Sequence, residues 1–180
     1  MGQYYRVVIL ADNKYNGKEK IRLWMCPSSY KYVGLKLTEH SYINNIFVQV
    51  LEYLISVDSM FHISRVVWAG DYADKEENDE NNLYGLVKNN GTYYYSLSSD
   101  TTKYRYIVNH TKKLYVDKSS CKTIHPLPLL VCEGNGNGGG DYYGNNKELC
   151  GTWARNHISM EKTIPDGFTE LVCNFYEDED

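Results

Sequence analysis

The sequence predicts an α+β protein, with a mainly antiparallel β-sheet and one principal packed α-helix at about residues 41–57. Short segments with the alternating or continuous apolar pattern of strands recur along the whole chain. Only one long segment has the 3.6-residue period of an amphipathic helix. The strands outnumber this helix too heavily for alternating βαβ units, which indicates a sheet of mostly antiparallel neighbours packed against a helix.

Ten segments have strand character. They are residues 4–11, 18–26, 32–37, 62–69, 93–97, 104–109, 114–116, 129–132, 153–159 and 168–175. In the second of these, Ile21, Leu23 and Met25 share one face, as expected of a half-buried strand. Asn16-Gly17 predicts a hairpin turn before it, because both residues tolerate positive φ. A second hairpin is expected to close around residues 110–113.

The helix is predicted from seven apolar residues at i, i+3, i+4 and i+7 spacing. They are Ile43, Ile46, Phe47, Val50, Leu51, Leu54 and Ile55. This spacing places them on one face of the helix, which we expect to bury against the sheet. Thr38 or Ser41 could cap the first turn.

Length and charge suggest one domain with two acidic segments. The 180 residues suit a single domain over 1–180, large enough to fold without a metal or a disulfide. The net charge is −4, while residues 74–80 and the tail 177–180 each carry −4, so the other residues sum to +4. We expect an acidic loop at 74–82 and a flexible acidic tail at 177–180. This balance argues against general duplex DNA binding, whereas a small anionic ligand remains compatible.

The cysteine and histidine patterns predict neither disulfides nor a cofactor. Five cysteines, an odd number, contain no C-x-x-C pair, and no leader-like or 18-residue apolar segment is visible. We therefore expect reduced thiols, no membrane association and a cytoplasmic location in a bacterial host. The five histidines lack the close spacing of a catalytic zinc site, so no metal or cofactor is expected.

Tyrosine is unusually frequent, with 18 residues against four Phe and three Trp. Its ring with a polar tip suits half-exposed strands, wet interfaces and ligand-binding walls. The sequence leaves these alternatives, and homo-oligomer formation, open.

The segment 133–144 holds six of the 14 glycines. Its backbone N–H groups could form a nest around a phosphate, or the segment could be an ordinary surface loop. Gly134, Gly136 and Gly139 match G-x-G-x-x-G, but poor helix-forming residues follow, so neither a dinucleotide-binding fold nor a P-loop is expected.

Residues 150–157 add the side chains that a nucleotide would need. Arg155 can bind a phosphate bidentately, and Trp153, Tyr142 or Tyr143 can stack on a base. In a strand, Trp153, Arg155 and His157 would share one face; the alternative is a core tryptophan beside surface polar groups. The expected ligand-binding set is Gly134, Gly136, Gly138, Gly139, Gly140, Asp141, Tyr142, Tyr143, Trp153 and Arg155. No catalytic residue is assigned.

Several stretches together resemble a kind of protein found in mobile genetic elements. They are Met1-Gly2-Gln3-Tyr4-Tyr5, the run from Val67 to Asp74, the run from Ile107 to Lys113, His125-Pro126-Leu127-Pro128, the glycine-rich loop and the run from Cys150 to Arg155. The chain resembles uncharacterised short proteins of phages and mobile elements of gut-type bacteria. This resemblance implies an anti-defence role, through capture of a nucleotide second messenger or through binding of a host defence protein.

Three functions follow as hypotheses. The first is a binding protein that sequesters a small anionic nucleotide without chemistry. The second is a protein–protein inhibitor of a defence nuclease, with the acidic segments as a nucleic-acid mimic. The third is a nucleotide-cleaving enzyme with His110, His125 or His157 as general base. A basic surround of the glycine-rich loop would favour the first, and a contiguous acidic face the second.

Overall fold

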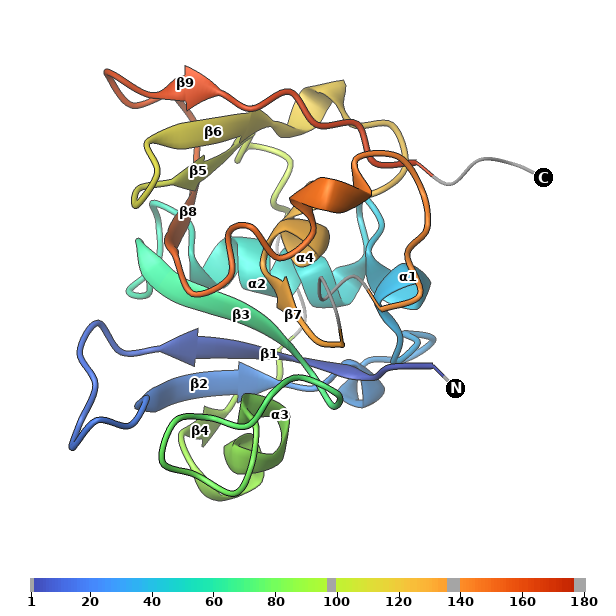
Figure 1. Cartoon of the computed structure of the whole chain (residues 1–180). Helices are drawn as coiled ribbons and strands as arrows, with labels where there is room; N and C mark the ends of the chain where they lie inside the picture. The colour runs from blue at the N-terminus through green and yellow to red at the C-terminus, as the bar shows by residue number, and fades with distance from the viewer. Residues whose placement is uncertain (1, 97–99, 136–139, 177–180) are drawn as a thin grey trace.

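A nine-stranded mixed sheet is the framework of the protein in the computed structural model, which describes residues 2–96, 100–135 and 140–176 (Figure 1). The strands are β1 (Tyr5–Leu10), β2 (Ile21–Met25), β3 (Ser64–Gly70), β4 (Thr92–Tyr93), β5 (Tyr106–Asn109), β6 (Leu114–Asp117), β7 (Cys132–Glu133), β8 (His157–Glu161) and β9 (Thr169–Glu170). Their order is β4-β2-β1-β3-β8-β5-β6-β9, with β7 also paired to β3. Short β4, β7 and β9 run parallel to their neighbours and the other pairs are antiparallel.

Four short α-helices accompany the sheet in the described residues. They are α1 (Leu37–His40), α2 (Ile46–Leu54), α3 (Leu83–Leu86) and α4 (Pro126–Leu130), and the 3₁₀ turns are η1 (Pro27–Ser29), η2 (Val87–Asn89), η3 (Lys118–Ser120) and η4 (Lys147–Leu149). An α+β fold in which the sheet predominates is therefore confirmed. The prediction of one principal helix is not confirmed, and the sheet is mixed.

The sheet needs more than one helix because its central strands are buried on both faces. Val7 and Ile9 of β1 pack into a large core with α2, whereas Val8 and Leu10 pack into a smaller core with α3 and η2. Figure 1 shows α2 and α4 on one side of β3, with α3 near β1 and β2 on the other. Strands covered on both faces have continuous apolar runs, which is the pattern of residues 7–10.

The helix α2 is shorter than the segment 41–57 that the periodicity predicted. The Asn45 side chain caps it by accepting hydrogen bonds from the backbone N–H groups of Phe47 (2.9 Å) and Val48 (3.4 Å). The residues before this cap belong to a turn held to the segment 123–125, since the N–H of Ile43 donates to the Thr123 carbonyl at 2.9 Å. Neither Thr38 nor Ser41 caps α2.

From sequence, the prolines predict an extended stretch at 125–128 and the apolar run predicts a strand at 129–132, and the helix α4 contradicts both. Pro126 instead starts α4, because its fixed φ suits the first helical position. His125 caps this helix by accepting the N–H of Leu127 on Nδ1 at 3.2 Å. Only Cys132 and Glu133 then pair with β3.

The prediction of a strand over 153–159 is wrong in its first half. Residues 150–155 form turns in which Gly151 (φ 75°) and Arg155 (φ 63°) adopt left-handed backbone conformations. The strand β8 begins only at His157. Trp153, Arg155 and His157 therefore do not share the face of one strand.

Other local predictions are confirmed. Asn16 (φ 51°) and Gly17 (φ 75°) form the tight turn between β1 and β2, and Lys113 (φ 54°) lies in the β5–β6 hairpin. The strand predicted over 32–37 is wrong, because Tyr32 adopts a left-handed backbone (φ 62°) and α1 begins at Leu37. Residue 97 and the tail 177–180 lie outside the described residues. Within the described ranges, no helix is both long and apolar enough to cross a bilayer.

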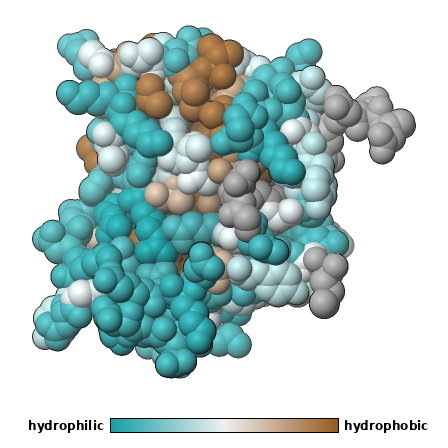
Figure 2. Space-filling view, in the orientation of Figure 1, coloured by the Kyte–Doolittle hydropathy of each residue, from teal (hydrophilic) through white to brown (hydrophobic). Residues whose placement is uncertain are grey.

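The surface divides by polarity. Figure 2 shows that hydrophilic residues dominate the lower part of the viewed face, where Figure 1 places β1, β2 and α3. Apolar residues gather near the top, in the region of β6 and β9. Among the described large apolar side chains near β9, Val172 is 79% exposed.

Truncation of the buried face of α2 tests this packing. Phe47→Ala or Leu51→Ala should lower the free energy of unfolding by about 2–5 kcal/mol, because both side chains are fully buried in the larger core. Tyr53→Ala, on the exposed side of the same helix, is the matched control. Chemical denaturation of the three variants measures the difference, and equal losses for Phe47→Ala and Tyr53→Ala would contradict the assignment.

Candidate functional site

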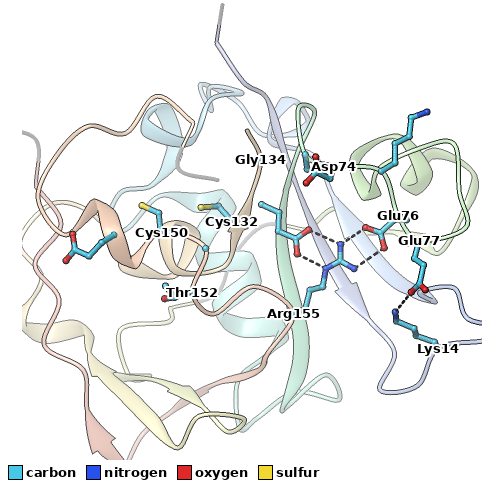
Figure 3. Close-up of a pocket in the computed structure, with 14 residues that line it drawn as sticks. Lys14, Asp74, Glu76, Glu77, Cys132, Gly134, Cys150, Thr152 and Arg155 are labelled. Carbon is cyan, nitrogen blue, oxygen red and sulfur yellow. Dashed lines mark hydrogen bonds and ion pairs between the residues drawn. The ribbon is translucent and has the colours of Figure 1, made fainter. Parts of the chain in front are cut away.

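A cavity of about 630 Å³ lies between the acidic loop and the segments around β7 and η4. It is lined by Lys14, Ala73, Asp74, Lys75, Glu76, Glu77, Cys132, Glu133, Gly134, Glu148, Cys150, Gly151, Thr152 and Arg155. We call it the acidic pocket. Figure 3 shows Arg155 at its centre, between Glu76 on one side and a carboxylate from the β7 side on the other.

Arg155 is fully engaged by carboxylates. Its Nε and one Nη donate to the two Glu133 oxygens at 2.6 and 2.8 Å. Its other Nη donates to Glu76 at 2.9 Å, and a second, very short bond completes a bidentate pair with that residue. A third carboxylate, Glu19, lies 3.5 Å from the guanidinium. Burial works against the charge of Arg155, but these carboxylates outweigh it and raise the pKa of the guanidinium above its ordinary value.

The backbone holds Arg155 in place. Its N–H donates to the Val66 carbonyl of β3 at 2.9 Å, and its own carbonyl accepts Arg65 Nε at 3.2 Å. Arg65 in turn forms a bidentate pair with Glu19, at 2.9 and 3.0 Å. Burial opposes ionisation of Glu19, but Arg65 outweighs it and holds the pKa of Glu19 below its ordinary value. Two arginines and three glutamates thus form one network of ion pairs.

The pocket is negative overall. Its lining has five carboxylates, from Asp74, Glu76, Glu77, Glu133 and Glu148, and three cations, from Lys14, Lys75 and Arg155, a net charge of −2. Lys14 pairs with Glu77 at 3.6 Å, and Lys75 with Glu80, outside the lining, at 3.4 Å. Asp74 and Glu148 form no ion pair within residues 2–96, 100–135 and 140–176.

Among the described residues of the glycine-rich segment 133–144, Glu133 and Gly134 line the pocket. Gly134 lines the wall, and a side chain there would clash with Gln3. Gly140 has a φ of +60°, and a Cβ on it would lie 2.5 Å from the Tyr5 hydroxyl. Both glycines are thus explained by close packing against the start of β1. Gly136, Gly138 and Gly139, which were expected to cradle a phosphate, lie outside the described residues.

The other expected ligand residues are dispersed. Trp153 is 1% exposed and belongs to the main core, which leaves no ring face for a base. Tyr142, also 1% exposed, borders a separate cavity of about 230 Å³, and Asp141 accepts the Thr38 hydroxyl at 2.5 Å. Tyr143 is 79% exposed beside Lys147. Of the seven residues of this set that the structure describes, it brings Gly134 and Arg155 to the acidic pocket.

His125 belongs to a buried cluster away from this pocket. Its Nδ1 accepts the Leu127 N–H, so the proton lies on Nε2 and is donated to Glu52 at 2.7 Å. Glu52 also accepts Lys118 Nζ at 2.6 Å and the Thr101 hydroxyl. Burial alone would raise the pKa of Glu52, but the interactions with His125 and Lys118 outweigh it and lower the pKa to about 2. With both nitrogens occupied, His125 is not placed to accept a substrate proton.

His110 and His157 lie near β8 in another polar cluster. Ser159 donates to Glu161 at 2.6 Å, so His110 Nε2 donates to the Ser159 oxygen at 2.7 Å. Burial lowers the pKa of His110. His157 Nε2 lies 3.0 Å from Asp12, on the exposed surface. Ser159 is completely buried, so this chain of bonds presents no accessible nucleophile.

No local sequence pattern indicates the Arg155 network. Its members Glu19, Arg65, Glu76 and Glu133 come from four segments separated by many residues. Only the cluster of carboxylates at 74–80 was visible, and it was interpreted as a solvated loop. No group of three or more His, Cys, Asp or Glu side chains suited to a metal ion occurs in the described part of the chain.

Comparison of the chain with known protein families, with curated proteins and with solved structures finds no significant match. The interpretation of the site therefore rests on its geometry and charge.

Removal of the central arginine tests the network. Arg155→Ala should lower the free energy of unfolding by about 3 kcal/mol, because it leaves largely buried carboxylates without their cation. Arg105→Ala is the matched control, since it breaks an Arg–Asp pair whose arginine side chain is 53% exposed. Such an exposed pair contributes little to stability, because water and salt screen its charges. Urea unfolding of both variants gives the comparison, and similar small losses would refute a structural role for Arg155.

The low pKa of Glu52 predicts a pH dependence. A carboxyl whose pKa falls from 4.5 to about 2 on folding stabilises the native state above pH 4.5, and this stabilisation is lost as the pH falls toward 2. The stability difference between wild type and Glu52→Gln should therefore shrink over that range. Glu148→Gln, which removes an exposed carboxyl, is the control. The measurement is the free energy of unfolding from pH 7 to pH 2. A stability difference between wild type and Glu52→Gln that stays constant over this range would contradict the lowered pKa of Glu52.

Proposed function

We propose that this protein is a binding protein whose acidic pocket captures a cationic group, such as an arginine or lysine side chain of a basic partner protein. The observation that carries the proposal is the saturation of Arg155 by Glu133 and Glu76 in a pocket whose lining carries a net charge of −2. This corresponds to the second hypothesis from the sequence, a protein–protein inhibitor with an acidic surface.

Simple electrostatics supports a cation over an anion. At about 5 Å and an effective dielectric of 20, two unit charges interact by about 3 kcal/mol. A phosphate approaching the guanidinium would gain this attraction once, but would meet comparable repulsion from both Glu76 and Glu133. A monovalent cation at the same place would be repelled once by the guanidinium and attracted by both carboxylates. Asp74 and Glu148, which have no described ion-pair partner, would add to its attraction.

The size of the pocket also suits a side chain. A cavity of about 630 Å³ is within the range of small-molecule sites and would admit the extended stem and head group of an arginine. Arginine offers five donors in a planar fork, which carboxylates bind bidentately. The Arg155 network shows this geometry within the protein itself, since both Glu76 and Glu133 bind its guanidinium in that way.

The resemblance to phage and mobile-element proteins suggests where such a partner would be found. Nucleic-acid-binding surfaces are rich in arginine and lysine, and an acidic inhibitor competes with phosphates for them. We therefore propose a host defence nuclease as the first partner class to test. Nucleotide capture stays a prediction that the described contacts of Arg155 and Trp153 do not support, and its expected glycine nest lies outside the described residues.

Titration of the full chain with defined probes tests the proposal. An arginine hexapeptide and a lysine hexapeptide should bind, and ATP and a cyclic dinucleotide should not, as measured by calorimetry at low salt. Binding should weaken as salt is added, because screening acts on exposed charges. Detection of nucleotide binding without peptide binding would overturn the proposal.

Two variants locate the binding. Asp74→Asn and Glu148→Gln leave the Arg155 ion pairs in place, and each should weaken peptide binding roughly three- to tenfold, or about 0.7–1.4 kcal/mol. Glu170→Gln on the exposed strand β9, which does not line the pocket, is the charge-matched control. An equal effect of all three variants would show that net charge, rather than the pocket, attracts the peptide.

A further inference from the structure

Two cysteines lie together in the wall of the acidic pocket. Cys132 is the first residue of β7, and Cys150 directly follows η4 (Figure 3). Backbone hydrogen bonds hold the two segments against each other, since Gly151 N–H donates to the Leu129 carbonyl at 2.9 Å and Trp153 N–H to the Leu130 carbonyl at 2.8 Å. Both thiols are thus placed by the same backbone pairing that forms the pocket wall.

The surroundings of the two thiols differ. The Cys132 thiol is buried and donates to the Leu129 carbonyl at 3.1 Å, which keeps its proton in place. Cys150 is 5% exposed and also lines the cavity. The neighbouring Cys132 thiol lowers the pKa of Cys150, although burial and the Glu148 carboxylate act against this, whereas Cys150 and burial raise the pKa of Cys132. Cys150 is therefore the member of the pair that more readily forms a thiolate.

We propose that Cys150 and Cys132 form a peroxide-reactive dithiol site, in which Cys150 is oxidised first and Cys132 then closes a disulfide. The inference rests on the pairing of the thiols in the pocket wall and does not depend on which ligand the pocket binds.

The reaction is balanced with hydrogen peroxide as the oxidant. The Cys150 thiolate attacks one peroxide oxygen, an S–O bond forms, the O–O bond breaks, and the leaving hydroxide takes a proton to become water. The Cys132 sulfur then attacks the sulfenic sulfur of Cys150, the S–S bond forms and the S–O bond breaks. The second hydroxide leaves as water with the Cys132 proton. Two thiols are oxidised to one disulfide, and one peroxide is reduced to two waters.

The pocket selects the oxidant by charge. Glu133 and Glu148 line the cavity beside the thiols, so anionic reagents are repelled while neutral hydrogen peroxide can enter. The remaining buried thiols are poorer sites, because burial raises the pKa of Cys121 and raises that of Cys173 to about 12. Thiol reactivity depends on the thiolate and on access, and Cys150, which has a lowered pKa and lines the cavity, meets both conditions better than Cys121 or Cys173.

Oxidation would also alter the pocket. A disulfide would tie β7, which carries Glu133, to the turn that carries Thr152. The two segments of the pocket wall could then no longer move apart at these cysteines. The site is therefore positioned to couple oxidation of the protein to the shape of the acidic pocket.

The test is brief exposure of the reduced full chain to hydrogen peroxide, followed by intact-mass and peptide mass spectrometry. The expected product is two hydrogens lighter and contains a Cys132–Cys150 cross-linked peptide. Cys132→Ser should accumulate a sulfenic acid at Cys150, trapped by dimedone, whereas Cys150→Ser should form neither product. Cys121→Ser, which removes a half-buried thiol outside the pocket, is the control and should behave like wild type.

A second measurement on the wild type alone avoids dependence on the folding of the variants. A cationic methanethiosulfonate should modify Cys150 at least tenfold faster than an anionic one, because the surrounding carboxylates attract the first and repel the second. Oxidation that begins at Cys26 or Cys121, or a disulfide that omits Cys150, would overturn the proposal. If the Cys132–Cys150 disulfide forms but Cys150 reacts equally fast with both reagents, the dithiol site is supported and selection of the oxidant by charge is refuted.

Discussion

The ion pairs of Arg155 are the interaction on which the pocket depends. Its guanidinium joins Glu133 of β7 to Glu76 of the acidic loop, and lies beside Glu19 next to β2. These carboxylates would otherwise repel one another across a partly buried space. The left-handed backbone of Arg155 (φ 63°) directs it from the turn before β8 into this gap. One cation thus holds together segments that are far apart in the chain, and the residual negative charge defines what the pocket can attract.

The secondary structure could be predicted where one physical signal dominated. The 3.6-residue repeat of Phe47, Val50 and Leu51 identified α2, and Asn16-Gly17 identified the first hairpin, because these patterns are local. Secondary-structure prediction failed where two local sequence preferences indicated different structures. Pro126 and Pro128 were interpreted as extended, yet proline at the first helical position favours α4. The capping of α2 at Asn45 was likewise missed, since the apolar spacing already began at Ile43.

The site was less predictable because its contacts are not local. Arg155 was predicted to bind a ligand, but its partners Glu19, Glu76 and Glu133 are distant in sequence and are brought together by the pairing of β2 with β1, β1 with β3 and β3 with β7. Because of the same strand pairing, Arg155, which was expected to bind a phosphate, lies at the centre of an ion-pair network. Trp153 was expected on a strand face, whereas the turn over 150–155 directs it into the core. A glycine-rich stretch suggested a nest, although Gly134 and Gly140 are explained by close packing on Gln3 and Tyr5.

We propose that Arg155 stays paired with Glu133 and Glu76 and does not bind an anionic ligand. Side-chain ¹⁵N NMR of arginine measures this directly, because the guanidinium signals report hydrogen bonding and proton exchange at that group. We expect the Arg155 N–H protons to exchange slowly with solvent. Their signals should stay unchanged when excess ATP or a cyclic dinucleotide is added to the full chain. Rapid exchange in the free protein, or a saturable shift of these signals on addition of nucleotide, would contradict it.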